Sequence, residues 1–244
     1  MKGVILAGGT ATRLLPLTSV TNKHLLPVYD KPMIFYPIET LKSAGIRDIL
    51  IITSPHHGGA IFSLFGSGKE FGVNFTYKLQ DEPSGIPSAI GIAEDFVGGH
   101  KFVSINGDNI LTHSIKRFVS EFEKGKEEAR ILLYKGTIEQ ARKSGVAILN
   151  DDRVVQLIEK PQNPPTTMIS IGVYMYKPIV FDIIKQLKPS ARGETEITEL
   201  NNHFLKKGTL KASVIEGHWL DAGTIEELLE ANIKLRKLRK GESD

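Results

Sequence analysis

Cysteine is absent from this 244-residue chain, and tryptophan occurs once. The absence of cysteine excludes disulfide bonds, thiolate metal sites and a cysteine nucleophile, and it is compatible with a reducing compartment. An excess of one charge is also lacking, since 31 basic and 28 acidic residues leave a formal net charge of +3. So small and dispersed an excess argues against nucleic acid as a partner.

Long apolar runs are missing as well. No run approaches the roughly 20 residues that span a bilayer, and Gly8 and Gly9 interrupt the apolar start of the chain before a signal-peptide core can form. Hydrophobic residues make up 41% and charged residues 24%, the balance of an ordinary globular protein that can bury a sizeable core. We therefore expect a cytoplasmic protein that does not associate with a membrane.

The apolar segments alternate between strand-like and helix-like patterns, which predicts parallel strands joined by crossover helices. Strands are predicted at Gly3–Leu6, Asp48–Thr53, Asn74–Lys78, Lys101–Ile105, Ala129–Tyr134, Ile169–Tyr176 and Lys211–Ile215, and a β-hairpin at Gly145–Leu149 and Arg153–Ile158 around Asn150-Asp151-Asp152. Helices are predicted at Met33–Ser43, Pro87–Phe96, Ser114–Glu123, Pro178–Gln186, Glu196–Lys206 and Glu226–Lys240. The expected fold is α/β, with a Rossmann-like, doubly wound mixed sheet and an inserted antiparallel portion.

A glycine-rich segment, residues 8–14, follows the first predicted strand. Such a turn commonly holds phosphates, because its backbone N–H groups are free and no Cβ atoms obstruct the approach. The segment matches neither the Walker A pattern nor the dinucleotide fingerprint. Two adjacent glycines could equally form a tight turn at the end of the strand with no ligand. Arg13 favours the phosphate interpretation, since a guanidinium makes bidentate contacts to phosphate oxygens.

Several motifs in order along the chain resemble the sugar-phosphate nucleotidyltransferase family. They are GGxxTRL at residues 8–14, NKHLLPV at 22–28, QDEPSG at 80–85, NGDN at 106–109, GV at 145–146, EKP at 159–161 and WLDAGT at 219–224. The occurrence of these motifs in the expected order makes coincidence improbable. The resemblance implies one domain over residues 1–244, with a nucleotide-binding part at about 1–125, a sugar-phosphate-binding part at about 126–224 and a C-terminal helix at 225–240.

The resemblance implies a role for each matching residue. The nucleotide-binding residues would be Gly8, Gly9, Ala11, Thr12, Arg13, Lys23, Gln80 and Gly85, and the sugar phosphate would be bound by Asn109, Gly145, Glu159, Lys160, Ser170 and Gly172. Arg13, Lys23 and Asp108 would be catalytic, and Asp108 and Asp221 would hold Mg²⁺, a hard cation that prefers carboxylate and phosphate oxygens. The stretch from Arg192 to Thr198 also resembles the family and is interpreted as structural or interfacial.

Each assignment has a simpler alternative. Glu159 and Lys160 could form an exposed ion pair worth roughly 0–1 kcal/mol, and Asp221 could cap the helix that begins near Thr224. The single tryptophan, Trp219, is expected in the core. The histidines at positions 24, 56 and 57 are expected in surface loops, because no third metal ligand is spaced beside them.

Three features depart from the family pattern. Ala11 stands where the family usually has glycine, which costs about 1–2 kcal/mol if the backbone there needs a positive φ. The base-binding loop continues Gly85-Ile86-Pro87-Ser88 instead of Gly-Leu-Ala-Gln. Bacterial family members also continue past the last helix into segments that form a regulatory nucleotide site, so a short form without that site is expected.

Residues 25–32 most resemble the family members that join a nucleoside triphosphate, dTTP in preference, to glucose 1-phosphate. A uridylyltransferase or an enzyme for another sugar 1-phosphate is the first alternative, since a 5-methyl group gives only about 1–3 kcal/mol of discrimination. A non-catalytic sugar-nucleotide-binding subunit is the second. The resemblance further implies a homo-oligomer, either a dimer or a tetramer.

Overall fold

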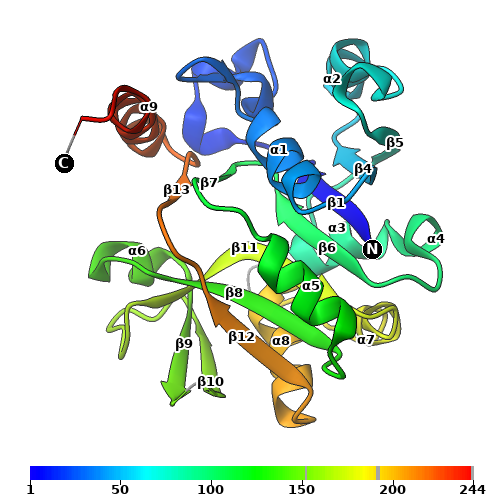
Figure 1. Cartoon of the computed structure of the whole chain (residues 1–244), viewed down its shortest axis with the longest axis vertical. Helices are drawn as coiled ribbons and strands as arrows, with labels where there is room; N and C mark the ends of the chain where they lie inside the picture. Colours follow the sequence, from blue (N-terminus) through cyan, green and yellow to red (C-terminus); the bar gives the residue numbers. More distant parts are fainter. Residues whose placement is uncertain (152, 191–192, 243–244) are drawn as a thin grey trace.

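The computed structural model describes residues 1–151, 153–190 and 193–242. Within these residues, nine strands form one sheet in the order β10-β9-β11-β6-β1-β4-β5, with β8 beside β11 and β12 beside β8 (Figure 1). The strands are β1 (Lys2–Ala7), β4 (Asp48–Thr53), β5 (Asn74–Leu79), β6 (Phe102–Asn106), β8 (Ala129–Lys135), β9 (Gly145–Asn150), β10 (Arg153–Glu159), β11 (Met168–Tyr176) and β12 (Leu210–Val214). Every predicted strand is present to within one residue at each end, which confirms the α/β class.

The sheet has a parallel half and an antiparallel half. Strands β6, β1, β4 and β5 are parallel, and Ile5 of β1 lies between Ile51 and Ile105. Strand β11 is antiparallel to β6, β8 and β9, and β9 pairs with β10 as the predicted hairpin. Asp152 of the predicted hairpin turn lies outside the described residues. The antiparallel portion is therefore an extension of the same mixed sheet, as expected.

Helices cover both faces of the sheet, and this double layer follows from the alternation of side chains along each strand. Ile5 points into a core that includes residues of α1, α2 and α5. Its neighbour Val4 points into a second core that includes residues of α3, α7 and α8. The helices are α1 (Phe35–Ser43), α2 (Gly58–Phe65), α3 (Ile86–Gly91), α4 (Glu94–Val97), α5 (Lys116–Lys124), α6 (Ile138–Lys143), α7 (Val180–Ile184), α8 (Ile197–Lys206) and α9 (Ile225–Lys240).

Two helices were not predicted and one predicted helix is divided. The segment predicted as one helix at Pro87–Phe96 forms α3 and α4. Helix α2 begins with Gly58 and Gly59, poor helix formers, and it is stabilised by burial of Ile61 and Phe65. Helix α6 begins with a capping box between Thr137 and Gln140, a recognisable signal in the sequence. None of the described helices is long and apolar enough to cross a membrane.

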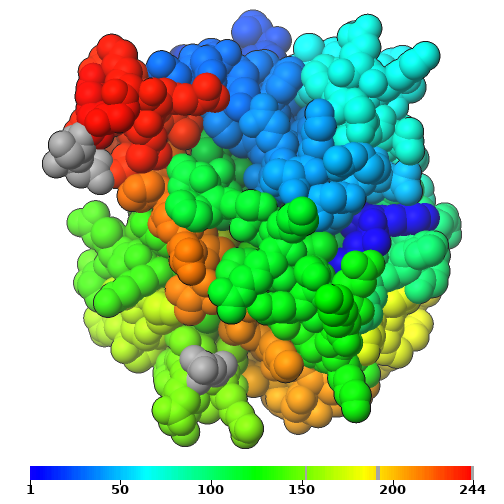
Figure 2. Space-filling view, in the orientation of Figure 1, coloured from blue at the N-terminus to red at the C-terminus, as the bar shows by residue number. Residues whose placement is uncertain are grey.

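A third core joins the C-terminal helix to the segment that follows β1. Leu228, Ala231 and Leu235 of α9 are buried together with Leu14 and Val28. Figure 2 shows α9, in red, lying against the blue N-terminal segment. This contact brings the residues just before α9 next to the glycine-rich loop, although about 200 residues separate them in the sequence.

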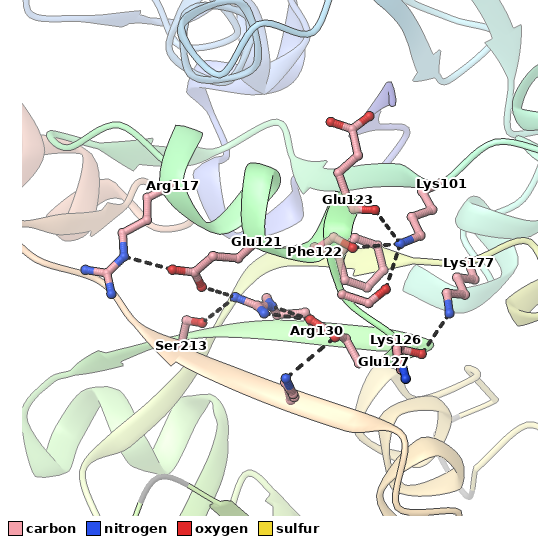
Figure 3. Close-up of polar contacts among 12 residues, drawn as sticks. Lys101, Arg117, Glu121, Phe122, Glu123, Lys126, Glu127, Arg130, Lys177 and Ser213 are labelled. Atoms are coloured by element: carbon pink, nitrogen blue, oxygen red, sulfur yellow. Dashed lines mark hydrogen bonds and ion pairs between the residues drawn. The ribbon is translucent and has the colours of Figure 1, made fainter.

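A buried charge network fastens the antiparallel half to α5 (Figure 3). The Arg130 guanidinium on β8 donates to Glu127 at 2.6 Å, to Glu121 of α5 at 2.7 Å and to Ser213 of β12 at 3.1 Å. Arg130 and Glu127 are both buried, so their charges require these partners. Arg130 is opposite Met175 of β11, and the network positions β8 and β12 without entering the clefts described below.

Candidate functional site

A cleft of about 380 Å³ lies over the carboxyl ends of β1 and β6. This is where open α/β sheets bind ligands. All eight residues predicted to bind the nucleotide line the cleft, together with the predicted catalytic carboxylate: Gly8, Gly9, Ala11, Thr12, Arg13, Lys23, Gln80, Gly85 and Asp108. Trp219, expected in the core, is buried.

Two of the cleft glycines have no room for a side chain. A Cβ on Gly8 would lie 2.4 Å from Oε1 of Gln80, so the loop passes directly over the glutamine amide. Gly85 has a φ of +103°, and a Cβ there would lie 2.2 Å from the carbonyl oxygen of Thr195. Gly85 therefore requires glycine for its backbone conformation and its contact with Thr195, whereas a Cβ on Gly8 would require the Gln80 amide to move.

Ala11 adopts the left-handed conformation, with a φ of 53° and a ψ of 32°. Ala11, which stands where the family usually has glycine, therefore does have the positive φ at which alanine is strained. Ala11 immediately precedes the 3₁₀ turn Thr12–Leu14, so the strain lies beside Arg13.

We expect Ala11→Gly to stabilise the protein by up to about 1 kcal/mol, because glycine adopts a positive φ without steric strain. The melting temperature should rise by about 2 °C in thermal unfolding followed by circular dichroism. Ala60→Gly is the matched control, since Ala60 is an exposed residue of α2 and glycine should lower stability there. An unchanged or lower melting temperature for Ala11→Gly would contradict the prediction.

Lys23 and Asp108 form an ion pair inside the cleft. The Nζ atom of Lys23 lies 2.5 Å from Oδ2 of Asp108, and both side chains are largely buried. Burial alone would raise the pKa of Asp108, but Lys23 and the hydrogen bond from Asn109 hold that pKa well below its usual range. Asp108 is therefore ionised at neutral pH, the state in which a carboxylate can act as a ligand to a cation.

The prediction that His24 lies in a surface loop is wrong. His24 is buried, its Nδ1 lies 2.7 Å from Oδ1 of Asn22, and a Cβ on Gly107 would lie 2.6 Å from its ring. Burial, with Lys23 adding to it, lowers the pKa of His24 to about 3, so the ring is neutral. Asn22 caps the 3₁₀ turn Lys23–Leu25, and that turn directs His24 inward and Lys23 toward Asp108.

Asp221 is brought beside Asp108 by a short two-stranded sheet. Strand β13 (Trp219–Asp221) is antiparallel to β7 (Asn109–Leu111), and Asp221 is paired with Asn109, the residue after Asp108. Burial, and next the charge of Asp108, raise the pKa of Asp221 to about 7. Its Oδ1 is buried and has no hydrogen-bond partner among the described residues. The alternative that Asp221 caps the last helix is wrong, because Thr224 is the N-cap of α9.

Glu227 belongs to this cluster, and the sequence analysis missed it. A Cβ on Gly223 would lie 3.1 Å from Arg13 Nη2, 3.4 Å from Asp221 Oδ1 and 3.5 Å from Glu227 Oε2. The Oε2 atom of Glu227 is buried without a partner among the described residues, and Oε1 lies 3.4 Å from Nζ of Lys143. Thr224 is the N-cap of α9 and its side chain accepts from the Glu227 backbone N–H, and the Thr224-x-x-Glu227 spacing by itself resembles a capping box.

The predicted sugar-phosphate residues form two groups, one on the antiparallel half of the main sheet and one around Asn109 of β7. A Cβ on Gly145 would lie 2.9 Å from Thr198 Oγ1, 3.4 Å from Glu159 Oε2 and 4.0 Å from Ser170 Cβ. The Thr198 hydroxyl also donates to Glu159. Glu159 lies 3.5 Å from the partly exposed Lys160, so the ion pair of the simpler alternative does form.

The second group surrounds the Asn109 side chain. Its Oδ1 accepts from the Gly172 backbone at 3.1 Å and from Trp219 Nε1 at 2.8 Å. These two bonds hold β11 and β13 beside the Asp108 turn. The group is therefore directly next to the carboxylate pair Asp108 and Asp221.

A second cleft, of about 450 Å³, adjoins the first. It is lined by Lys160, Trp219, Asp221 and Glu227, and Arg13 lines both clefts. Lys160 is thus brought to Asp221 and Arg13 but does not line the cleft that contains Lys23. Arg192 lies outside the described residues.

These features define a nucleotide-binding α/β fold with a carboxylate pair, and the chain belongs to the nucleotidyl transferase family, which it matches over residues 2–237. The glucose-1-phosphate thymidylyltransferase of Neisseria meningitidis is 42% identical over 239 residues, covering 95% of this chain and 81% of that enzyme. The low-salt glycan biosynthesis nucleotidyltransferase Agl11 of Haloferax volcanii is 44% identical over 95% of this chain, which spans 65% of the length of Agl11.

Solved structures agree with this membership. A crystal structure assigned to glucose-1-phosphate thymidylyltransferase of Bacillus anthracis, in complex with sucrose, has a TM-score of 0.92 and 48% identity, covering 97% of this chain and 95% of that one. A UDP-glucose pyrophosphorylase complexed with UDP-glucose has a TM-score of 0.86 and 26% identity, covering 97% of this chain and 98% of that one. The predicted Rossmann-like fold and family are confirmed.

Proposed function

We propose that this protein transfers the thymidylyl group of dTTP to glucose 1-phosphate, giving dTDP-glucose and pyrophosphate in a Mg²⁺-dependent reaction. The observation that carries the proposal is the meeting of Arg13, Lys23, Asp108 and Asp221 at two adjoining clefts. The similarity to glucose-1-phosphate thymidylyltransferases over nearly the whole chain supports it.

The chemistry is the displacement of pyrophosphate. An oxygen of the sugar phosphate forms a bond to the α-phosphorus of the triphosphate, and the bond from that phosphorus to the oxygen bridging toward the β-phosphorus breaks. The attacking oxygen is already anionic, so no general base is required. The protein must bring two polyanions together and balance the charge on the reacting phosphates.

Arg13 and Lys23 would supply that positive charge. Arg13 is exposed at the cleft and forms no ion pair among the described residues, so its guanidinium can bind a phosphate. Lys23 is held by Asp108 and can contact a second phosphate from the same position. Gly8, Gln80 and Gly85 would place the base by backbone and amide hydrogen bonds.

The sugar phosphate would bind next to the carboxylates. Lys160 would contact its phosphate in the cleft that it shares with Arg13. Glu159, held by the Thr198 hydroxyl beside Gly145 and Ser170, would accept hydrogen bonds from sugar hydroxyls. Asn109 would position the backbone around Gly172 for the same ligand.

The carboxylates present fit Mg²⁺. Asp221 has a buried oxygen without a hydrogen-bond partner among the described residues and a raised pKa, so a cation bound there would compensate its charge, and Asp108 is ionised next to it. No group of three or more potential ligands occurs in the described part of the chain, and Mg²⁺ is commonly held by one or two carboxylates together with substrate phosphates. Asp108 and Asp221 would hold the ion, which supplies charge neutralisation at the phosphates when bound.

Uridylyl transfer is the second candidate, favoured by the structural likeness to UDP-glucose pyrophosphorylase. Pyrophosphate release from dTTP and UTP, each with a series of sugar 1-phosphates, decides between the two through kcat/KM. We expect dTTP with glucose 1-phosphate to give the highest value. Binding of sugar nucleotide without pyrophosphate release from any pair would instead indicate the non-catalytic subunit and would overturn the proposal.

The proposal includes a homo-oligomer of two or four subunits in the cytoplasm. The subunit number comes from the family resemblance, and the location is the expectation drawn from the composition and apolar pattern of the sequence. Light scattering of the purified protein measures the subunit number, and cell fractionation measures the location.

A further inference from the structure

One side of the C-terminal helix is apolar and exposed. Ile225, Leu229 and Ile233 of α9 are 43%, 55% and 47% exposed, and their spacing of four residues places them on one side of the helix. We call these three residues the α9 stripe. The side of α9 that packs in the third core is a different one. The helix is therefore apolar on two sides, and only one of them is covered by the described part of the chain.

Other exposed apolar side chains gather beside the α9 stripe. Eight of the fifteen large apolar side chains exposed among the described residues belong to α9 or to residues 15–29, which follow Leu14 of the same core: Leu15, Leu17, Val20, Tyr29, Ile225, Leu229, Ile233 and Leu238. The Tyr29 backbone N–H donates to Asn232 Oδ1 at 2.7 Å, so Tyr29 lies against α9. Figure 2 shows the red helix and the blue segment adjoining at the surface. Such a concentration of apolar surface is typical of a protein–protein contact.

The charges of α9 are divided between its two halves. The acidic residues lie in the first half and the basic residues in the second: Glu226, Glu227 and Glu230, then Lys234, Arg236, Lys237, Arg239 and Lys240. Glu227 pairs with Lys143 and Arg239 with Asp30, whereas Glu226 forms no ion pair among the described residues. Side by side, two such helices repel one another when parallel and attract one another when antiparallel.

We propose that the α9 stripe is an interface between two copies of this chain, with the two α9 helices antiparallel about a two-fold axis. This inference rests on the homo-oligomer of the proposed function and names a surface for it. With the axis near the middle of α9, Leu229 lies opposite Ile233 of the second copy. Glu226 then lies beside Lys237 of the second copy, because both residues are on the same side of the stripe and nearly equally far from the axis.

Two other occupants of the stripe fit these observations less well. An anionic membrane would be repelled by Glu226 and Glu230 in the same helix that presents the stripe. An unrelated protein would not require a helix whose charges are complementary to their own reversed order. This reversed order of charge is the observation that favours a second copy of the chain.

Leu229→Arg tests the apolar contact, because Leu229 is exposed and arginine is a good helix former. Sedimentation velocity over a series of protein concentrations measures the subunit number and the Kd of the dimer. We expect the wild type to be a dimer, or a tetramer that uses this contact as one of two, and Leu229→Arg to raise the Kd at this contact at least about thirtyfold. Leu64→Arg is the matched control, since Leu64 is an exposed leucine of α2, and it should leave the assembly unchanged.

The charge pattern is tested by exchanging one acidic and one basic residue. Glu226→Lys and Lys237→Glu should each weaken the dimer about tenfold, because each places like charges side by side twice in a symmetric contact. The double variant should return the Kd to within about twofold of the wild-type value. Glu226 also lines the second cleft, so association and not turnover is the measurement. Thermal unfolding followed by circular dichroism establishes that each variant is folded.

A monomeric wild type, an unchanged assembly in folded Leu229→Arg, or a double variant as weak as the single variants would each overturn the inference. Binding of a monomeric wild type to vesicles of anionic phospholipid, with loss of that binding in Leu229→Arg, would assign the stripe to a membrane instead. Failure of the proposed reaction is distinguishable, because pyrophosphate release from dTTP and glucose 1-phosphate decides it. Release by a monomeric wild type would overturn this interface alone.

Discussion

Replacing Lys23 by alanine is expected to lower kcat roughly 100- to 1,000-fold, and replacing Arg13 by alanine roughly 100-fold, with the fold retained. Arg13 lines both clefts, and Lys23 reaches the reacting region through its ion pair with Asp108. Removing Lys23 also leaves the largely buried Asp108 carboxylate without its ion pair, so it affects both the positive charge that would face the phosphates and a proposed metal ligand. Arg13→Lys should restore little activity if the guanidinium contact is bidentate. Pyrophosphate release under saturating substrates measures kcat.

Matched controls lie on the surface of the same protein. Lys185 pairs with Glu94 and Arg117 pairs with Glu121, and both basic side chains are well exposed. Alanine at either position changes the net charge by the same amount and should leave kcat within about twofold. Turnover near the wild-type value in Arg13→Ala or Lys23→Ala would remove that residue from the mechanism.

The two proposed metal carboxylates should respond in opposite directions when each is replaced by asparagine. Without metal at pH 8, we expect Asp221→Asn to raise the free energy of unfolding by about 1–2 kcal/mol, and Asp108→Asn to lower it by a similar amount. The Oδ1 atom of Asp221 is buried and has no hydrogen-bond partner among the described residues, whereas Asp108 is paired with Lys23. Urea unfolding in chelator measures both values.

The pH dependence follows from the two pKa shifts. Burial and Asp108 raise the folded-state pKa of Asp221 to about 7, above an unfolded value of about 3.9. Its contribution to stability is therefore present at low pH and is lost as pH rises from about 4 to 7. The folded-state pKa of Asp108 is instead lowered, so its contribution is present above about pH 4 and is lost on acidification. The gain in free energy of unfolding from Asp221→Asn should thus be larger at pH 8 than at pH 5.

Both asparagine variants should nevertheless need more Mg²⁺ for turnover and have a lower kcat. Wild-type activity should disappear in chelator and return on addition of Mg²⁺, and Mg²⁺ with triphosphate should stabilise the wild type more than either variant. A lower stability for Asp221→Asn than for the wild type at pH 8 in chelator would contradict the assignment of Asp221 as an uncompensated charge.

Most of the strands could be predicted from the sequence because the signal is local. Runs such as Asp48–Thr53 are apolar and β-branched, and a strand buried on both faces needs little else. Helix α2 could not be predicted in this way. Its first two residues are glycines, and only the tertiary burial of Ile61 and Phe65 makes the helix favourable.

The candidate site was predictable where it is carried by contiguous motifs. The glycine-rich loop, Lys23 and Asp108 each lie in a short contiguous motif. The parallel pairing of β1 with β6 places the carboxyl ends of these two strands side by side. His24 was wrongly expected at the surface, and Glu227 was not predicted as part of the site. A histidine in a loop and a glutamate at the third position of a helix have ordinary local roles, and neither the burial of His24 nor the unpartnered oxygen of Glu227 is visible in the neighbouring residues.

By itself, the sequence determined the α/β class, the positions of most strands along the chain and the glycine-rich loop after the first strand, because periodicity and turn chemistry act over a few residues. Only the tertiary structure decided that Asp221 stands beside Asp108 and that Thr195 holds the base-binding loop. Both contacts cross more than 100 residues of chain and depend on the pairing of β13 with β7 and of Thr195 with Gly85. Such pairings are set by the packing of the whole sheet, since a three-residue strand has too few hydrogen bonds to select its own partner.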